Sequence, residues 1–162
     1  DAIVVDEGAT AGGGCYPSSA QSEPHDWLTL TGGSIGYGLP TAIGAAVACP
    51  ERKVVCVHGD GGAMYTVQSL WTMARENLDV TVVIFANRAY KILMSELTNV
   101  GAAAPGANAT AMLTLGNPDI DWVMIAKGYG VAAGRATTLD ELAVEFKRGL
   151  ETPGPYLVEL VM

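Results

Sequence analysis

Short runs of consecutive apolar residues recur along the chain and predict its strands. These runs lack the polar alternation that marks a strand with one exposed face, so we expect strands that are buried on both faces. The run at 80–86 is continuous and ends at Asn87. Similar runs lie at residues 2–5 and 53–58, with further extended segments at 28–30, 130–136 and 155–161.

Segments with helical spacing of apolar residues separate these runs. They predict helices at about 38–49, 63–77, 90–98, 119–128 and 139–150. The first is apolar nearly all round and should be deeply buried. Thr138 followed by Glu141 is a capping-box signal for the last. The Gly-, Ala-, Ser- and Pro-rich stretches at 8–24 and 99–117 are interpreted as loops, and the second is long enough for a lid or a partner-facing loop.

The alternation of buried strands and helices predicts an α/β fold. We expect a doubly wound, mainly parallel sheet with helices on both faces. A chain of 162 residues fits one domain. Sheets of this kind bind ligands at the carboxyl ends of their strands, so the residues that follow each strand are the first place to look for a site.

Composition narrows the classes of function. The chain is 49% hydrophobic and 16% charged, with a mean hydropathy of +0.27, which is more apolar than an ordinary soluble domain. No apolar run approaches the roughly 20 residues that span a bilayer, so we expect no membrane. The excess apolar surface predicts a large interface with another domain or another copy. A net charge of -8 and scattered basic residues argue against nucleic acid as a partner.

The cysteines indicate the compartment. Cys15, Cys49 and Cys56 are odd in number and irregular in spacing, which does not resemble a disulfide framework. Cys49 and Cys56 fall in apolar contexts where a cysteine behaves as a small hydrophobe. A reducing cytoplasm is therefore the expected setting.

Two of the predicted strands end in a polar group with oxygen donors. Asp60 stands among glycines after the strand at 53–58, and Asn87 ends the strand at 80–86. Neighbouring parallel strands would bring both to one edge, where their oxygens suit Mg²⁺ or Ca²⁺. The glycines and the helix start after Gly62 suit an anion, so a metal-bridged phosphate or diphosphate fits. Gly-Asp-Gly is also a common turn and Asp a good helix cap, so the tripeptide alone leaves a purely structural role equally open.

The spacing of these groups resembles the thiamine diphosphate signature. In that signature a Gly-Asp-Gly, here residues 59–61, precedes the Asn by 25 intervening residues. The resemblance implies that Asp60 and Asn87 bind Mg²⁺, that the Ala89 carbonyl completes the protein ligands, and that the metal binds the cofactor's diphosphate. The amides of Tyr90 and Lys91 would meet the β-phosphate.

The resemblance extends over essentially the whole chain. "LTLTGGSIGYGLPTAIGAA" is similar to the segment that holds the aminopyrimidine and thiazolium in the acetolactate synthase and benzoylformate decarboxylase superfamily, and "NPDIDWVMIAKGYG" and "GPYLVELV" also fit its C-terminal domain. By this match the Gly33 carbonyl would accept from the cofactor's exocyclic amine, and Ile35 would force the cofactor into its V shape. The implied cofactor-binding residues are Gly33, Ser34, Ile35, Gly59, Asp60, Gly61, Gly62, Asn87, Ala89, Tyr90 and Lys91.

The segment after Asn87 bears on the substrate. Acetolactate synthases carry a Gln-Trp-Gln element here, and "NRAYKILMSEL" lacks it. Pyruvate and indolepyruvate decarboxylases place a Glu where this chain has Leu93, which resembles benzoylformate decarboxylases instead. Ile92 and Leu93 would then line an apolar pocket for an aromatic or branched 2-oxo acid. An acetolactate synthase-type carboligase remains an alternative.

The family's activating Glu belongs to a separate pyrimidine-binding domain, usually of a neighbouring subunit. Glu7 lies near the start of the cofactor domain and is not assigned that role, so the catalytic residue is expected outside the chain. We expect residues 1–162 to form a single thiamine diphosphate-binding domain, without the pyrimidine-binding and central domains, as part of a homodimer or homotetramer. Alone it should catalyse poorly.

Two alternatives and several isolated residues remain. The chain could be a non-catalytic assembly or regulatory module, or a nucleotide-binding domain, although Gly-x-Gly-x-x-Gly follows neither metal-bearing strand. His25 and His58 are candidate acid–base groups, and His58 is better explained by packing at a strand end. Trp27, Trp71 and Trp122 are expected in the core or in an interface. Asp119 and Asp121 are expected to cap a helix.

Overall fold

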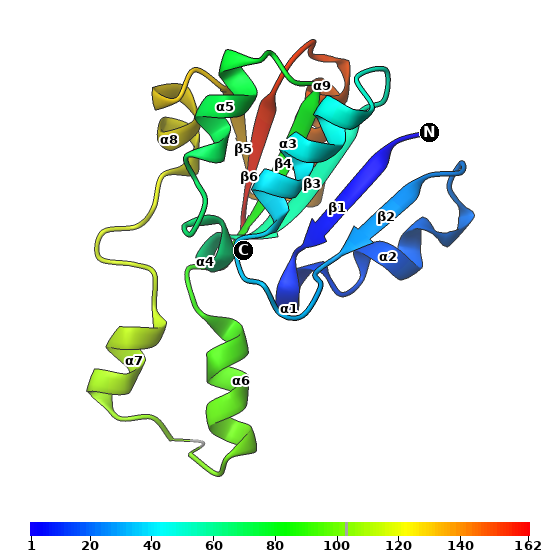
Figure 1. Cartoon of the computed structure of the whole chain (residues 1–162). Coiled ribbons are helices and arrows are strands. Elements are labelled where there is room, and N and C mark those ends of the chain that lie inside the picture. Colours follow the sequence, from blue (N-terminus) through cyan, green and yellow to red (C-terminus); the bar gives the residue numbers. More distant parts are fainter. Residues whose placement is uncertain (103) are drawn as a thin grey trace.

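The computed structural model describes residues 1–102 and 104–162. Six strands form one parallel sheet in the order β2-β1-β3-β4-β6-β5, which confirms the predicted α/β class (Figure 1). The strands are β1 Ile3–Glu7, β2 Asp26–Thr29, β3 Val54–Gly59, β4 Val80–Ala86, β5 Ala132–Ala136 and β6 Tyr156–Val161.

The register of the central strands explains why their sequences are apolar without alternation. Val5, Cys56, Val82 and Leu157 pair in one row across β1, β3, β4 and β6, and all four are fully buried in one cluster. Their sequence neighbours point to the other face, where a second cluster forms around residues such as Val83. Both faces of the sheet are therefore covered, so a polar residue in these strands would lose its contact with water.

Helices cover the two faces in the way that a doubly wound sheet requires. On one face, α3 Gly38–Ala48, α5 Ser69–Arg75 and α8 Trp122–Gly128 contribute Leu39, Leu70, Met73 and Trp122 to the larger cluster. On the other face, α1 Ala9–Gly12 and α9 Leu139–Glu151 pack Ala11, Leu142 and Phe146 on the smaller one.

A pair of helices projects from the carboxyl edge of the sheet and is called the arm here (Figure 1). It consists of α6 Lys91–Asn99 and α7 Ala107–Leu113. The segment 99–117 is thus not a plain loop, because Ala, Met and Leu after Gly106 favour a helix despite the Gly- and Pro-rich surroundings. No residue of α6 is buried.

Several other predicted boundaries were wrong in an informative way. The presumed loop at 8–24 contains α1, α2 Cys15–Ser18 and the short 3₁₀ helix η1 Ser19–Gln21. The helix predicted at 63–77 is divided into α4 Asp60–Ala63 and α5 by a turn, in which the Thr66 hydroxyl donates to the Gly36 carbonyl at 2.7 Å. The predicted burial of α3 holds only for its inner face, since Val47 is 62% exposed.

The start of α9 confirms the capping signal with one change. The Thr138 hydroxyl accepts from the Glu141 amide at 3.2 Å, while the Glu141 carboxylate accepts from the amide of Thr137 instead of Thr138. Within the two described ranges, none of the helices combines the length and apolar character needed to cross a membrane.

Two glycines of α3 provide a matched test of this packing. A Cβ at Gly38 would lie 2.7 Å from Cδ2 of the fully buried His58, whereas one at Gly44 meets nothing within 4 Å. We expect Gly38→Ala to lower the free energy of unfolding by about 1 to 3 kcal/mol through overpacking. Gly44→Ala should raise it by up to about 1 kcal/mol through helix propensity. Urea unfolding of both variants checks this, and equal midpoints would contradict it.

Candidate functional site

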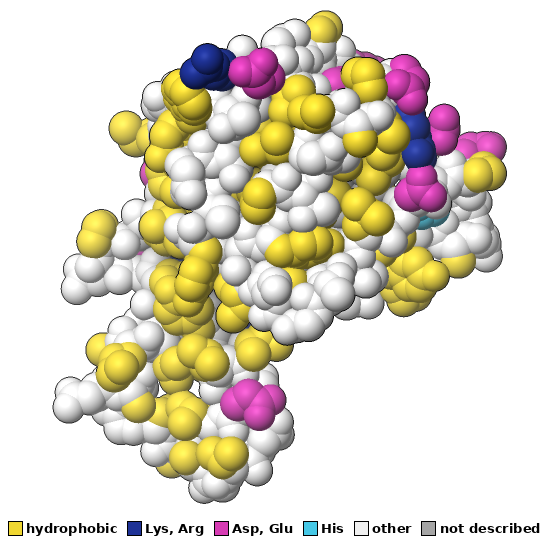
Figure 2. Space-filling view, viewed as in Figure 1, with side chains coloured by type: hydrophobic (Ala, Val, Ile, Leu, Met, Phe, Trp, Pro, Cys, Tyr) yellow, Lys and Arg dark blue, Asp and Glu magenta, His cyan; other side chains and the backbone are white. Residues whose placement is uncertain are grey.

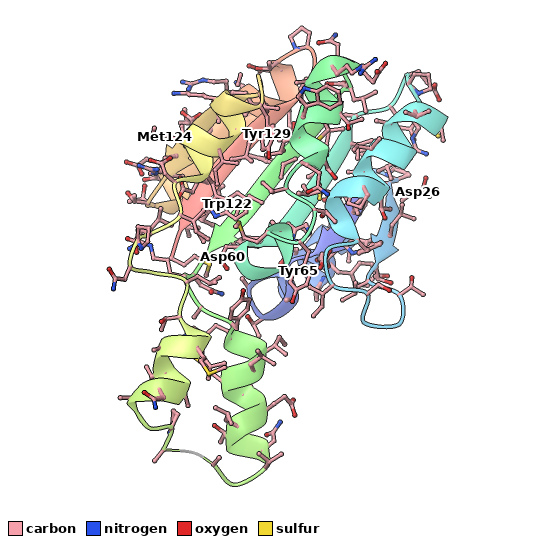
Figure 3. The ribbon with its side chains drawn as sticks, turned by 60° about the vertical axis from the view of Figure 1, so that its left-hand side comes forward. Asp26, Asp60, Tyr65, Trp122, Met124 and Tyr129 are labelled. Carbon is pink, nitrogen blue, oxygen red and sulfur yellow. The ribbon has the colours of Figure 1, made fainter. Side chains whose placement is uncertain are left out.

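Asp60 and the segment that begins at Asn87 meet at the carboxyl edge of the sheet, as the topology predicts. β3 and β4 are neighbours, with Gly59 paired to Phe85, and Asp60 and Asn87 follow at the ends of these strands. The Asp60 carboxylate accepts from the amides of Gly61 at 2.9 Å and Arg88 at 2.7 Å. The Asn87 side-chain oxygen accepts from the Ala89 amide at 3.0 Å. Figure 3 places Asp60 where the sheet meets the arm.

The environment of Asp60 favours a cation beside it. Asp60 is 3% exposed. Burial raises the pKa of its carboxyl, although the hydrogen bonds from the Arg88 and Gly61 amides lower it. A raised pKa means that the charged form is incompletely compensated. A bound cation would supply the missing positive charge.

The oxygen atoms at this edge suit a hard cation whose other ligands are phosphate oxygens and water. Among the described residues, no group of three or more His, Cys, Asp or Glu side chains could hold a metal. A metal at Asp60 therefore depends on neutral oxygens, such as those of Asn87 and Ala89. Mg²⁺ is commonly bound by one or two carboxylates together with substrate phosphates and water, so these residues fit it.

A short antiparallel pairing holds the base of the arm beside these residues. Ala89 pairs with Thr114, the Tyr90 amide donates to the Leu113 carbonyl at 2.9 Å, and the Leu115 amide donates to the Arg88 carbonyl at 2.7 Å. The Tyr90 amide is therefore engaged in this structure. Its expected contact with a phosphate stays a prediction that requires this bond to open, while Lys91 stands at the start of α6.

The glycines around Asp60 have a structural reason that the sequence did not suggest. A Cβ at Gly61 would lie 2.8 Å from the Tyr90 ring, and one at Gly62 would lie 2.9 Å from both Glu7 Oε1 and His58 Cε1. At Gly59 the nearest such neighbour is 3.9 Å away. Gly61 and Gly62 therefore accommodate protein side chains, whereas a Cβ at Gly59 would meet only backbone oxygens at van der Waals distance.

The turn that carries Gly33 and Ile35 is built from left-handed glycines. Gly32, Gly33 and Gly36 have φ values of +62°, +68° and +86°, a conformation that glycine adopts readily. Gly33, Ser34 and Ile35 are exposed, and Ile35 is 61% exposed. The turn thus presents to solvent the residues that were expected to contact the organic half of the cofactor.

Glu7 is the residue of this site that the sequence analysis missed. It is 4% exposed at the end of β1, and its two carboxylate oxygens accept from the amides of Gly36 at 2.5 Å and Gly38 at 2.6 Å. α3 receives no side-chain cap from its own preceding residue, Tyr37. Glu7 therefore caps α3 from a different element, with its negative charge at the positive end of the helix.

His58 completes the environment of Glu7. The imidazole is fully buried, with Nε2 at 2.9 Å from Glu7 Oε2 and Nδ1 at 3.0 Å from the Gly59 carbonyl oxygen. The Nε2 approach is off the line of a well-aligned hydrogen bond, so the contact is mainly electrostatic. Burial raises the pKa of Glu7, but the neighbouring His58 and the hydrogen bonds from the Gly36 and Gly38 amides outweigh it and hold the pKa below its usual value.

The other histidine lies elsewhere. His25 precedes the edge strand β2, with Nδ1 at 2.8 Å from the Glu23 carbonyl oxygen and Nε2 at 3.1 Å from the Ser19 hydroxyl. These contacts are local, and the structure does not join His25 to the cluster around Asp60. His58 is fully buried and His25 makes only local contacts, so neither histidine is an exposed acid–base candidate beside Asp60 and Asn87.

The remaining candidates have mixed outcomes. Trp122 is buried in the core, Trp71 is half exposed with the Arg75 guanidinium 5.2 Å from its ring, and the half-buried Trp27 donates to Asp6 at 3.3 Å. Asp121 caps α8 through the Met124 amide at 2.8 Å, as expected.

Asp119 does not cap α8 and instead pairs with the Arg88 guanidinium at 2.9 Å, because α8 begins only at Trp122. Ile92 and Leu93 are 51% and 49% exposed on α6. A pocket lined by Ile92 and Leu93 therefore stays a prediction.

Comparison with known proteins agrees with this geometry. The family model described as "Thiamine pyrophosphate enzyme, C-terminal TPP binding domain" matches residues 12–160. The "Putative acetolactate synthase large subunit IlvX" of Mycobacterium tuberculosis is 52% identical over 162 residues, covering 99% of this chain and 32% of that protein. Benzoylformate decarboxylase of Pseudomonas aeruginosa is 33% identical over 162 residues, covering 99% of this chain and 29% of that protein.

A solved structure shares the fold. The thiamine diphosphate-dependent 4-hydroxybenzoylformate decarboxylase of Rhodococcus jostii RHA1 superposes with a TM-score of 0.85 at 30% identity, covering 100% of this chain and 29% of that chain. This chain therefore spans about a third of the length of each of these three relatives.

The lowered pKa of Glu7 gives a pH dependence with a defined sign. The unfolded carboxyl, with a pKa near 4.5, binds protons more readily than the folded one. The stabilisation is therefore present above that value and is lost as the pH falls through the lower folded pKa. Glu7→Gln should lower Tm at about pH 7, and its difference from wild type should shrink towards about pH 3. Glu23→Gln, at an exposed position, is the control, and a difference that grows on acidification would contradict the assignment.

Proposed function

This chain belongs to the thiamine pyrophosphate enzymes as a C-terminal TPP-binding domain, and from that premise we propose that its carboxyl edge binds the diphosphate of thiamine diphosphate through Mg²⁺. The observation that carries the proposal is the buried Asp60 carboxylate, whose pKa is raised and which faces the segment 87–89. A divalent cation would compensate Asp60 and bridge it to a diphosphate.

Each part of the site has a task in this proposal. Asp60 and Asn87 would hold the cation with the Ala89 carbonyl, and Gly59 would leave space for the diphosphate. The Gly33 carbonyl and the exposed Ile35 would hold the organic half. The bound cofactor would supply the electron sink for decarboxylation of a 2-oxo acid. The chain's own contribution is to bind and orient that cofactor.

The substrate is the finer part of the proposal. The apolar Ile92 and Leu93, exposed at the start of the arm, support an aromatic or branched 2-oxo acid and a benzoylformate decarboxylase-like reaction. Relatives named for benzoylformate decarboxylase and its 4-hydroxy homologue support the same choice. The second candidate is an acetolactate synthase-type carboligase, which the name of the 52% identical relative favours.

The partner proposed here is the pyrimidine-binding domain of a neighbouring subunit or of the full-length protein. Large apolar side chains are exposed around the carboxyl edge and along the arm, and Figure 2 shows the scatter of apolar side chains over this face. Such a surface suits a protein partner, which would also supply the activating Glu. A homodimer or homotetramer would provide it. The exposed apolar residues of this surface are Ile35, Met64, Tyr65, Ile92, Leu93, Val100 and Met112.

Three free thiols, one of them fully buried, support the cytoplasmic setting.

Loss of the Asp60 charge should abolish cofactor binding. Thiamine diphosphate with Mg²⁺ at about 100 times its Kd stabilises a protein by roughly 2.7 kcal/mol, or roughly 5–10 °C in Tm for a domain of this size. Asp60→Asn should lose this shift, because the carboxamide carries no charge for the cation. Thermal melts with the cofactor and Mg²⁺ against EDTA measure it.

Asp119→Asn is the matched control, since it removes an exposed carboxylate from the same edge. It should retain the full shift. Retention of the shift by Asp60→Asn would contradict the proposed metal site, and loss in both variants would point to a general electrostatic effect.

A further inference from the structure

Glu7 joins three parts of the carboxyl edge that are far apart in the sequence. Its carboxylate, on β1, accepts from the turn before α3 through Gly36 and from the first residue of α3 through Gly38. The same carboxylate contacts His58 of β3, two residues before Asp60. Glu7 therefore connects the proposed organic half of the site with the proposed metal half.

The contacts around Glu7 leave little space for these parts to shift. A Cβ at Gly38 would lie 3.2 Å from Glu7 Cβ, and one at Gly62, in α4, would lie 2.9 Å from Glu7 Oε1. A Cβ at Gly36 would lie 2.7 Å from Tyr65 Cβ. Backbone thus packs directly against Glu7 and its surroundings from both sides, so a change in the position of its carboxylate must move the turn.

The donor pattern requires an acceptor-only group at this position. The Gly36 and Gly38 amides can only donate. The two amides donate to different oxygens of the carboxylate, and His58 Nε2 lies 2.9 Å from one of them. A carboxylate satisfies these neighbours, whereas the isosteric Gln would place an NH₂ group against a donor. The site therefore distinguishes Glu from Gln at constant shape.

We propose that Glu7 is a positioning residue for the organic half of the cofactor. Its carboxylate fixes the turn of residues 33–38 relative to the β3 end, so that the Gly33 carbonyl faces the aminopyrimidine while Asp60 holds the metal. This inference rests on the proposed function and deepens it. Glu7 acts through the turn and does not itself touch the cofactor.

Two probes separate the organic half of the ligand from its diphosphate half. Calorimetric titration of the full protein with Mg²⁺ plus thiamine diphosphate, and with Mg²⁺ plus inorganic diphosphate, reports each half. Glu7→Gln should weaken thiamine diphosphate at least about tenfold and change diphosphate less than about twofold. Asp60→Asn should weaken both.

Glu159→Gln is the matched control for general destabilisation. Glu159 is another buried carboxylate of the same sheet, 2% exposed, and it accepts from Arg135 at 2.9 Å, on the β5–β6 side of the sheet. It should leave both affinities unchanged. Equal weakening of both probes by Glu7→Gln, or weakening of neither, overturns the positioning role.

A second variant covers a Glu7→Gln protein that does not fold, and amide exchange gives a second readout for one that does. Thr66→Val removes the hydroxyl that holds the Gly36 carbonyl at 2.7 Å and should weaken thiamine diphosphate selectively by a few fold. Amide exchange at Gly36 and Gly38 should accelerate at least about tenfold in Glu7→Gln while β3 and β4 keep their protection. Unchanged exchange in the turn overturns the proposal.

The same titrations test the proposed function separately. Normal binding of both probes by Asp60→Asn refutes the metal site and leaves the Glu7 comparison intact. Failure of the wild-type protein to bind either probe refutes the proposed function, and the role of Glu7 is then refuted with it.

Discussion

The arrangement of the carboxyl edge depends on one buried carboxylate that is satisfied by backbone N–H groups. Glu7 caps α3 from another strand and contacts His58, so β1, β3 and α3 meet at a single charged group. A buried charge is costly unless every neighbour compensates it, and here two amides and an imidazole do so. The cost of removing any one of them helps to hold the edge in one arrangement.

Glu7 and Asp60 are two buried carboxylates whose surroundings differ. Both are acidic, buried and bonded to amides at the ends of adjacent strands. Their pKa values nevertheless move in opposite directions, because Glu7 has a histidine beside it whereas burial dominates at Asp60. Protein groups alone compensate the charge of Glu7. The surroundings of Asp60 are suited to a cation that binds together with a ligand.

The sequence predicted most of the fold and the meeting of Asp60 with the segment that begins at Asn87. The metal and cofactor contacts expected of these residues stay predictions. The strand at 80–86 was predicted to the residue, because a continuous apolar run has one interpretation in a sheet covered on both faces. α7 was missed because its alanines stand among glycines and prolines. Glu7 was missed because its partners are 29 and 31 residues away, a distance that local pattern does not report. Thr66, in the turn between α4 and α5, likewise bonds to a residue 30 positions away, Gly36.

The arm leaves the sheet and returns to it at one point, where residues 88–90 pair with 113–115. An excursion whose two ends are joined can gain or lose residues without changing the register of any strand. The arm can therefore change in length and sequence during evolution while the carboxyl edge of the sheet stays constant. Enzymes with different substrates could share this sheet and differ mainly in the length and side chains of that excursion, which is a direct route from one common scaffold to several specificities.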